Sequence, residues 1–211
     1  MNDFLPLFPL ELVVFPGEDL HLHIFEPRYK QLIKDCEEGD LTFGIPVYLN
    51  KKLMNIGTEL TLVSVEKKYF NGELDIRTRG LNIFNVKEFY PIAPRKLYGA
   101  ADIERLSFAT DEDLQKNEKI LDLTRELFQL LNITKTLPED ANNFLTYDIA
   151  HHIGLTLAQE YQLLQMLDAS ERQAFILFHM EGLLPVVREM ENLKVKAQLN
   201  GHFKHLNPPT L

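Results

Sequence analysis

Serine, cysteine and histidine are side chains that can act as nucleophiles, bases or metal ligands. The serines are Ser64, Ser107 and Ser170. Ser64 falls inside a predicted strand, Ser107 lies near a predicted domain junction, and Ser170 is predicted to cap a helix. None of them stands on the sharp strand-to-helix turn that exposes a serine nucleophile. We therefore expect no catalytic serine.

Cys36 is the single cysteine of the chain. It shares helical spacing with Leu32 and Ile33, which predicts a small buried core residue rather than a reactive thiol. A single cysteine cannot form an intramolecular disulfide, and this suits a reducing compartment. We expect a cytoplasmic protein.

Histidines offer the most plausible metal ligands in this sequence. His21 and His23 are two residues apart, so they lie on the same face of a predicted strand and could share a metal ion. Two histidines without a third ligand are more often packing or solvent-facing residues, so we predict no metal site and no cofactor. The remaining pairs have weaker geometry: His151 with His152, adjacent on a predicted helix, and His202 with His205, in the tail.

The sequence lacks the motifs of two common kinds of nucleotide-binding site. A phosphate-binding loop ends in Gly-Lys followed by Ser or Thr, and the sequence contains no Gly-Lys dipeptide. The dinucleotide-binding pattern G-x-G-x-x-G is missing as well, because no two glycines lie two residues apart. We expect no ATPase activity.

The charge balance argues against polyanionic partners. The formal net charge is −9, with −3 in residues 1–108 and −6 in residues 109–211. Binding to nucleic acid or to an anionic membrane surface needs a basic face, so we expect neither partner. Apolar runs fall short of the ~20 residues that span a bilayer, and the opening segment lacks a secretory signal pattern.

The first half of the chain has the pattern of short strands. Residues 1–108 hold 7 of the 10 glycines and 7 of the 11 prolines, which separate alternating apolar runs. Asn71-Gly72 is a two-residue hairpin signal. We predict one helix over 27–37 and strands over 20–25, 42–49, 59–70, 73–79, 81–90 and 96–106, the pattern of a closed or nearly closed antiparallel barrel.

The second half reads as helices. Thr156 with Gln159 and Ser170 with Gln173 both fit the capping box that starts a helix. Gly182 and Pro185 should kink or break the last helix. We predict helices over 114–131, 138–152, 157–167 and from 171 to beyond 190, which together form a bundle of about four helices.

These elements predict an α+β protein with an antiparallel β-barrel followed by a C-terminal helical bundle. The predicted boundaries place the barrel and its helix in residues 1–108. The helical bundle takes residues 109–200, and an irregular tail takes residues 201–211.

The opening of the chain carries a more specific pattern. The segments Leu5–Leu10, Val13–Gly17 and Phe25–Tyr29 closely resemble the start of the Lon substrate-binding domain family, the amino-terminal domain of the ATP-dependent protease Lon. In the helical half, Tyr161–Gln165 and Ser170-Glu171-Arg172 resemble later signatures of the same family. The resemblance runs in order over residues 4–192.

The resemblance implies a PUA-like β-barrel followed by helices, and a non-catalytic binding module rather than an enzyme. In the protease, a member of peptidase family S16, the ATPase and the Ser-Lys dyad lie in later domains. Unfolded or partner protein segments are the implied ligands, and Glu26, Arg28 and Tyr29 are the implied peptide-binding residues. A purely structural role is the alternative for them: Pro27 would start the helix, Tyr29 would pack, and Glu26 would pair with Arg28.

Three other functions remain open from the sequence. The chain could bind a small molecule, bind RNA through a PUA-like barrel, or hydrolyse a substrate at an unrecognised site. A deep pocket with converging titratable groups would favour a hydrolase. A contiguous patch of exposed phenylalanines would favour peptide binding, since the chain has 14 Phe and no Trp.

Overall fold

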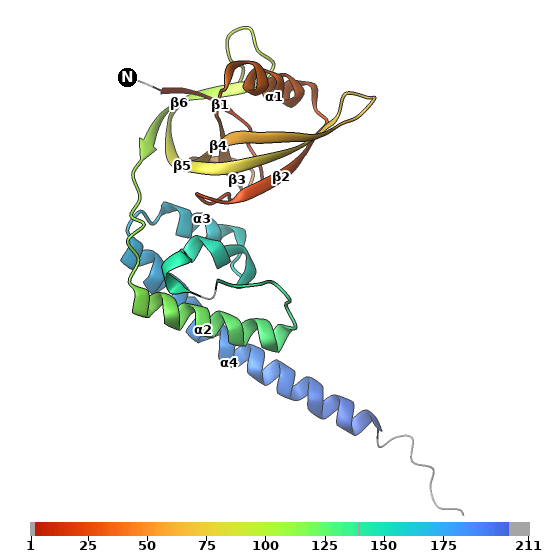
Figure 1. Cartoon of the computed structure of the whole chain (residues 1–211), viewed down its shortest axis with the longest axis vertical. Helices are drawn as coiled ribbons and strands as arrows, with labels where there is room; N and C mark the ends of the chain where they lie inside the picture. Colours follow the sequence, from red (N-terminus) through yellow and green to blue (C-terminus); the bar gives the residue numbers. More distant parts are fainter. Residues whose placement is uncertain (1–2, 139, 203–211) are drawn as a thin grey trace, which may run out of the picture. The chain divides into compact units, whose positions relative to one another are not determined.

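The computed structural model describes residues 3–138 and 140–202 and confirms the α+β class (Figure 1). The chain forms two compact units. The first contains the residues up to 110 together with residues 150–169, and the second contains residues 111–149 and those from 170 onward. Residues 150–169, which the sequence boundary at 108 assigns to the bundle, thus cluster with the strands.

The first unit holds all strands of the described chain and two α-helices. Its short alternating runs form strands where prolines and glycines separate them, and Pro27 stands at the first turn of a helix. The elements are β1 (Asp3–Leu7), β2 (Asp19–Ile24), α1 (Pro27–Gly39), β3 (Phe43–Leu49), β4 (Lys52–Lys68), β5 (Leu74–Tyr90), β6 (Gly99–Leu106) and α3 (Leu157–Gln165).

The strands follow the order β2-β5-β4-β3-β1-β6, and a further pairing joins β6 to β5. The pairings therefore close into a ring of β5, β4, β3, β1 and β6, with β2 added beside β5. One detail differs from the predicted antiparallel barrel: β1 pairs with β3 in parallel, so the sheet is mixed. Parallel neighbours need a long crossover connection, and β2 with α1 supplies it here.

Two predictions for the region of the long β4–β5 hairpin are wrong. Its turn is a five-residue loop, 69–73, rather than a two-residue turn; Gly72 has φ +77°, and the Asn71 side chain accepts a hydrogen bond of 3.1 Å from the Glu73 amide. The predicted strands 73–79 and 81–90 form one strand through Gly80. A Cβ at Gly80 would lie 2.3 Å from the Phe15 carbonyl oxygen, so glycine permits a close approach there.

The core of the first unit lies between the strands and α1. The predicted apolar stripe of α1 is confirmed, because Tyr29, Leu32, Ile33 and Cys36 are all buried. They pack with strand residues such as Phe43 in one cluster. This packing fixes the start of α1 against the sheet, which matters for the site described below.

The second unit is helical, but one of the helices predicted for it is wrong. In place of a helix over 138–152 there are two short 3₁₀ turns, because Asp140 and Asp148 accept hydrogen bonds from nearby backbone amides and so compete with a regular helix. The elements are α2 (Leu114–Leu131), η1 (Ala141–Asn143), η2 (Thr146–His152), which reaches into the first unit, and α4 (Ala169–His202).

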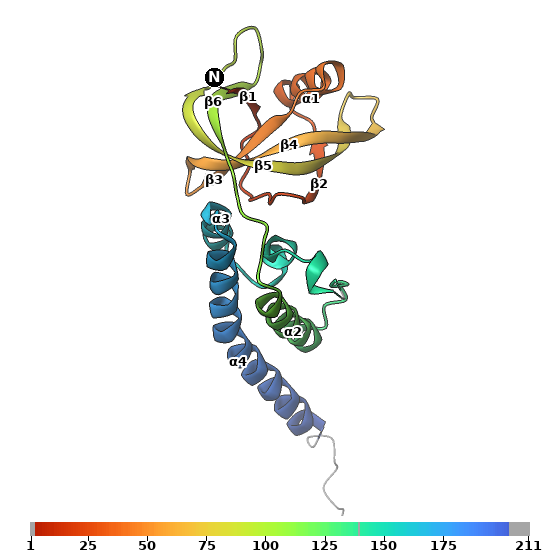
Figure 2. The ribbon, with the colours of Figure 1, turned by 60° about the vertical axis from the view of Figure 1, so that its left-hand side comes forward.

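Of the predicted kink or break at Gly182 and Pro185, the break is wrong, because α4 continues through both residues. Figure 2 shows a gradual bend in this helix. The predicted capping box of Ser170 and Gln173 does not start α4, because the helix begins at Ala169. The Gln173 side-chain amide donates to the Asp113 carbonyl at 2.8 Å and thereby joins α4 to the start of α2. The predicted tail beyond residue 202 lies outside the described residues.

Within the described ranges, no helix combines the length and the apolar character needed to cross a membrane.

Candidate functional site

The start of α1 displays a pair of opposite charges. Glu26 precedes the helix with extended backbone angles, φ −72° and ψ 137°, and Pro27 fixes the first helical position. The Arg28 guanidinium donates to one Glu26 carboxylate oxygen through Nε at 2.9 Å and lies 2.8 Å from it through Nη2. Both side chains are exposed enough to meet a ligand, at 51% for Arg28 and 38% for Glu26.

Tyr29 points inward from the same corner. Its ring stacks on Phe8 with centroids 3.7 Å apart, and the residue is 5% exposed. Burial raises the pKa of the Tyr29 hydroxyl. The Arg28 guanidinium lies 4.5 Å from the Tyr29 ring centroid. This cation–π contact helps to hold Arg28 in position.

Aromatic side chains adjoin this corner, and all of them are exposed except the half-buried Tyr69. We call His23, Phe25, Tyr69 and Phe70, the chain neighbour of Tyr69, the aromatic cluster. The His23 ring lies 6.3 Å from Phe25 and 5.7 Å from Tyr69 between centroids. Phe25 is 60% exposed and Phe70, at the tip of the β4–β5 hairpin, is fully exposed. Large apolar rings mark a protein-binding surface where they gather in one exposed patch.

Hydrogen bonds hold the cluster in place. His23 Nδ1 lies 2.7 Å from an oxygen of Asp75, and His23 Nε2 lies 3.1 Å from Glu73. The Tyr69 hydroxyl donates to the other Asp75 oxygen at 2.7 Å. The bond to Asp75, assisted by that to Glu73, raises the pKa of His23 above its ordinary value against a smaller opposing effect of burial.

The hairpin and the helix are linked at this surface. Lys30 of α1 donates to the Asn71 carbonyl oxygen at 3.3 Å, and Figure 1 shows the hairpin projecting beside α1. The Glu26–Arg28 pair and the aromatic cluster therefore belong to one continuous region of the first unit.

The other sequence candidates lie elsewhere. Ser64 lies in β4 opposite Arg77, Ser107 follows β6, and Ser170 lies within the first turn of α4. Cys36 is buried, and burial raises the pKa of its thiol to about 12.

His21 and His23 contact different carboxylates. His21 Nδ1 lies 3.2 Å from Glu66, a carboxylate different from those that contact His23. Among the described residues no three side chains of the metal-binding types gather into a metal site. Of the tail pair, His205 and the side chain of His202 lie outside the described part of the chain.

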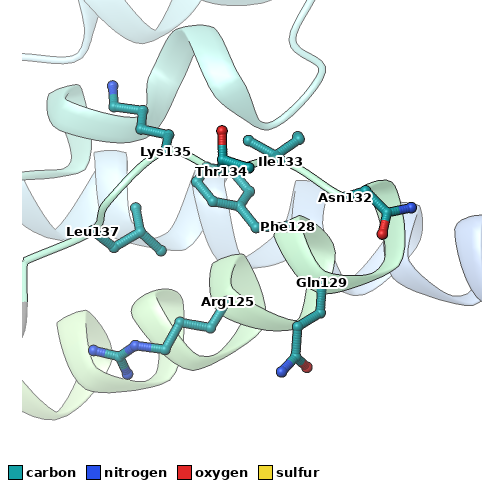
Figure 3. Close-up of a pocket in the computed structure, with 8 residues that line it drawn as sticks. All are labelled: Arg125, Phe128, Gln129, Asn132, Ile133, Thr134, Lys135 and Leu137. Atoms are coloured by element: carbon teal, nitrogen blue, oxygen red, sulfur yellow. The ribbon is translucent and has the colours of Figure 1, made fainter.

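A cleft of about 570 Å³ opens on the second unit, between α2 and the segment that follows it (Figure 3). Phe128, Ile133 and Leu137 give it an apolar lining, and Arg125 and Lys135 add two positive charges. Its volume falls within the range of small-ligand pockets, ~300–1,000 Å³. No pattern in the sequence indicates this cleft.

The aromatic cluster was also missed from the sequence. Register brings it together, since His23 of β2 pairs with Asp75 of β5. Two signals could have indicated it: Phe25 directly follows an alternating strand, and Phe70 directly precedes the Asn71-Gly72 turn, where solvent exposure is expected.

Comparison with known proteins identifies relatives of the whole arrangement. Residues 4–182 match the family described as the ATP-dependent protease La (LON) substrate-binding domain. A Lon protease of Cytophaga hutchinsonii is 23% identical over 215 residues, which cover 93% of this chain and 25% of that protein. The chain thus spans about a quarter of the length of that relative.

Two solved structures share the fold. A Lon N-terminal domain protein from Xanthomonas campestris has a TM-score of 0.67 at 25% identity, covering 83% of this chain and 97% of that one. The N-terminal domain of a Mycobacterium avium complex Lon protease has a TM-score of 0.61 at 14% identity, with 85% and 98% covered.

Proposed function

The chain belongs to the LON substrate-binding domain family, and we propose that it is a non-catalytic recognition module that binds unfolded or partner protein segments. The observation that carries this proposal is the aromatic cluster beside the Glu26–Arg28 pair. Its two exposed phenylalanines, Phe25 and Phe70, would lose water on contact with apolar side chains of a ligand.

Such a surface suits an extended polypeptide. The cluster offers apolar contact, and the Glu26–Arg28 pair offers one acceptor and one donor at its rim. Strand β2 stands at the end of the strand order and leads directly into Phe25. A segment aligned along β2 could add backbone hydrogen bonds to the side-chain contacts, and this would make binding tolerant of sequence.

Tyr29 takes an indirect part in this proposal. Because it is buried against Phe8, it positions Arg28 rather than contacting the ligand. Glu26 and Arg28 are the residues of the predicted set that we propose to touch the bound segment.

The test is binding of a permanently unfolded polypeptide, such as a reduced and carboxymethylated small protein carrying a fluorophore. Fluorescence anisotropy should show binding to the wild-type chain. The variant Phe25→Ser with Phe70→Ser should bind at least about tenfold more weakly, as expected for aromatic anchors. Phe178→Ser on α4 is the matched control, because Phe178 is 80% exposed but lies in the other unit. Equal binding by all three proteins would refute the proposed site.

The cleft of the second unit supports a second candidate, a small amphipathic anion. Its apolar lining would take the hydrocarbon part, and Arg125 with Lys135 would take the charge. Thermal shift measurements with short-chain aliphatic carboxylates test it. The wild-type Tm should rise, and Arg125→Ala with Lys135→Ala should lose the rise.

The remaining expectations also stay proposals. We propose a reducing cytoplasmic setting, because the chain has one cysteine and it is buried. The net charge of −9 supports protein segments over nucleic acid as ligands.

A further inference from the structure

Helix α4 continues past the core of its unit. Val187 is its last buried side chain, and no described side chain from Arg188 to Gln198 is buried. Figure 2 shows this part of α4 running on beyond α2. Helices in proteins are stabilised mainly by packing of one face, and this segment buries no described side chain. A partner packed against it would therefore stabilise it.

The projecting segment carries an apolar seam. The seam consists of Val186, Met190, Leu193 and Ala197, separated by four, three and four residues. All four are exposed, and the first three are 55%, 63% and 58% exposed. Alternating steps of three and four are the a and d spacing of a coiled coil, with Met190 and Ala197 at a and Val186 and Leu193 at d.

Charges beside the seam select the partner and its direction. In this register Glu189 occupies a g position and Lys194 the following e position. In a parallel pair of identical helices, each g residue faces the e residue five positions later on the other helix. Glu189 would therefore face Lys194 of a second copy, twice by symmetry. An antiparallel pair would instead bring g toward g and e toward e, which places like charges together.

The intramolecular alternative is weak. Lys194 lies 3.0 Å from Glu191 of its own helix, and the Lys194 side chain is 56% exposed. Exposed pairs of this kind contribute little and leave the lysine free to change partner.

We propose that α4 forms a parallel two-stranded coiled coil with α4 of a second copy of this chain, along the Val186–Ala197 seam. The contact is short, so the dimer is weak and depends on concentration. So few apolar layers should bury less than the ~1,200 Å² of a standard interface, and contacts of that size are typical of weak complexes.

Sedimentation velocity of the full chain between about 10 µM and 1 mM tests this proposal, because a weak dimer forms in this range of concentration. The sedimentation coefficient should rise from that of a monomer towards that of a dimer. Leu193→Glu should weaken association by at least about tenfold, as expected for a central apolar residue. Val195→Glu is the matched control, because Val195 is 50% exposed, two residues away and off the seam.

The charge pattern has its own test. Glu189→Lys and Lys194→Glu should each weaken self-association, since each places like charges at both g–e contacts. An equimolar mixture of the two variants should associate again, because every g–e contact in the mixed dimer joins opposite charges. A monomer at all concentrations, equal effects of Leu193→Glu and Val195→Glu, or no recovery in the mixture would overturn the proposal.

Discussion

Glu59 shows how the first unit accommodates a charged group in its interior. Its side chain is 3% exposed, and Arg105 donates to it through Nε at 2.7 Å and Nη2 at 2.8 Å. Thr42 donates at 2.6 Å and Asn82 at 3.1 Å. Burial favours the protonated form, but these donors outweigh it and lower the pKa of Glu59 to about 2.

This environment predicts a loss of stability in acid. The pKa of Glu59 falls from 4.5 to about 2 on folding. Ionised Glu59 therefore contributes roughly 3 kcal/mol to the free energy of unfolding. This contribution is present above pH 4.5 and is lost as the pH falls towards 2. In urea unfolding between pH 5 and pH 2, Glu59→Gln should be less stable at pH 5 and should lose less stability in acid than the wild type. The exposed Glu104→Gln is the control, and a Glu59→Gln slope equal to that of the wild type would contradict the prediction.

The Glu26–Arg28 pair predicts a different outcome. Because both side chains are exposed, Arg28→Ala and Glu26→Ala should each cost less than ~1 kcal/mol in urea unfolding. The double variant should cost about the same as either single variant. Binding of the unfolded polypeptide should fall in all three. A stability loss of ~3 kcal/mol or more in Arg28→Ala would show that the pair is a structural one.

Among the elements, α3 is joined to the strands by a charged histidine. His151 Nδ1 lies 2.8 Å from Glu160 of α3, and His151 Nε2 lies 3.2 Å from Glu18, which precedes β2. The Glu18 carboxylate also accepts the Phe15 amide at 2.8 Å. Burial lowers the pKa of His151, but the two carboxylates outweigh it and raise the value to about 9.

The attachment of α3 should therefore weaken in alkali. The pKa of His151 rises from 6.5 to about 9 on folding. The stabilisation is complete below pH 6.5 and is lost as the pH rises through 9, by up to roughly 3 kcal/mol. Urea unfolding at pH 6.5 and at pH 9.5 should show this loss in the wild type and a smaller loss in His151→Gln. His21→Gln serves as an exposed control. An unchanged pH dependence in His151→Gln would contradict the assignment.

The elements also show what the sequence could predict. Helices α1 and α3 were predictable because local signals start them: Pro27 at the first helical position, and the capping box of Thr156 and Gln159. The helix predicted over 138–152 failed because short polar side chains there bind the backbone locally. Glu26 and Arg28 were identifiable only through a family resemblance, and their mutual pairing was expected as one of two alternatives.

The rest of the candidate site depends on tertiary pairing. His23 and Asp75 are 52 residues apart and meet through the register of β2 and β5. Local sequence does not determine which residues of two distant strands pair. The aromatic cluster could therefore not be predicted from the sequence alone.

At the scale of the whole molecule, the first unit includes residues 150–169, and this predicts the effect of ending the chain at residue 110. Ile153, Leu163 and Leu164 belong to this unit and are fully buried, and the Ile56 amide donates to the Tyr161 hydroxyl at 3.3 Å. A chain ending at residue 110 lacks these contacts. Burial of three such side chains contributes ~5–9 kcal/mol, comparable to the ~5–15 kcal/mol by which a typical domain is stable.

The truncated chain should therefore lose cooperative unfolding, measured by circular dichroism in urea. A chain ending at residue 169 is the control, because it retains every residue of the first unit, and it should keep a cooperative transition for that unit. Unfolding of the 1–110 chain at the midpoint of the control would show that residues 150–169 are dispensable to the first unit.

The central claim is that the molecule binds unfolded segments at the aromatic cluster and its charged rim. Titration of the ¹⁵N-labelled chain with the unlabelled unfolded polypeptide, followed by amide chemical shifts, tests it most directly. The account predicts shifts concentrated at residues 20–30 and 67–75, and their loss in the Phe25→Ser, Phe70→Ser variant. Shifts confined to the α2 cleft around residues 125–137, or no shifts with saturating polypeptide, would contradict it.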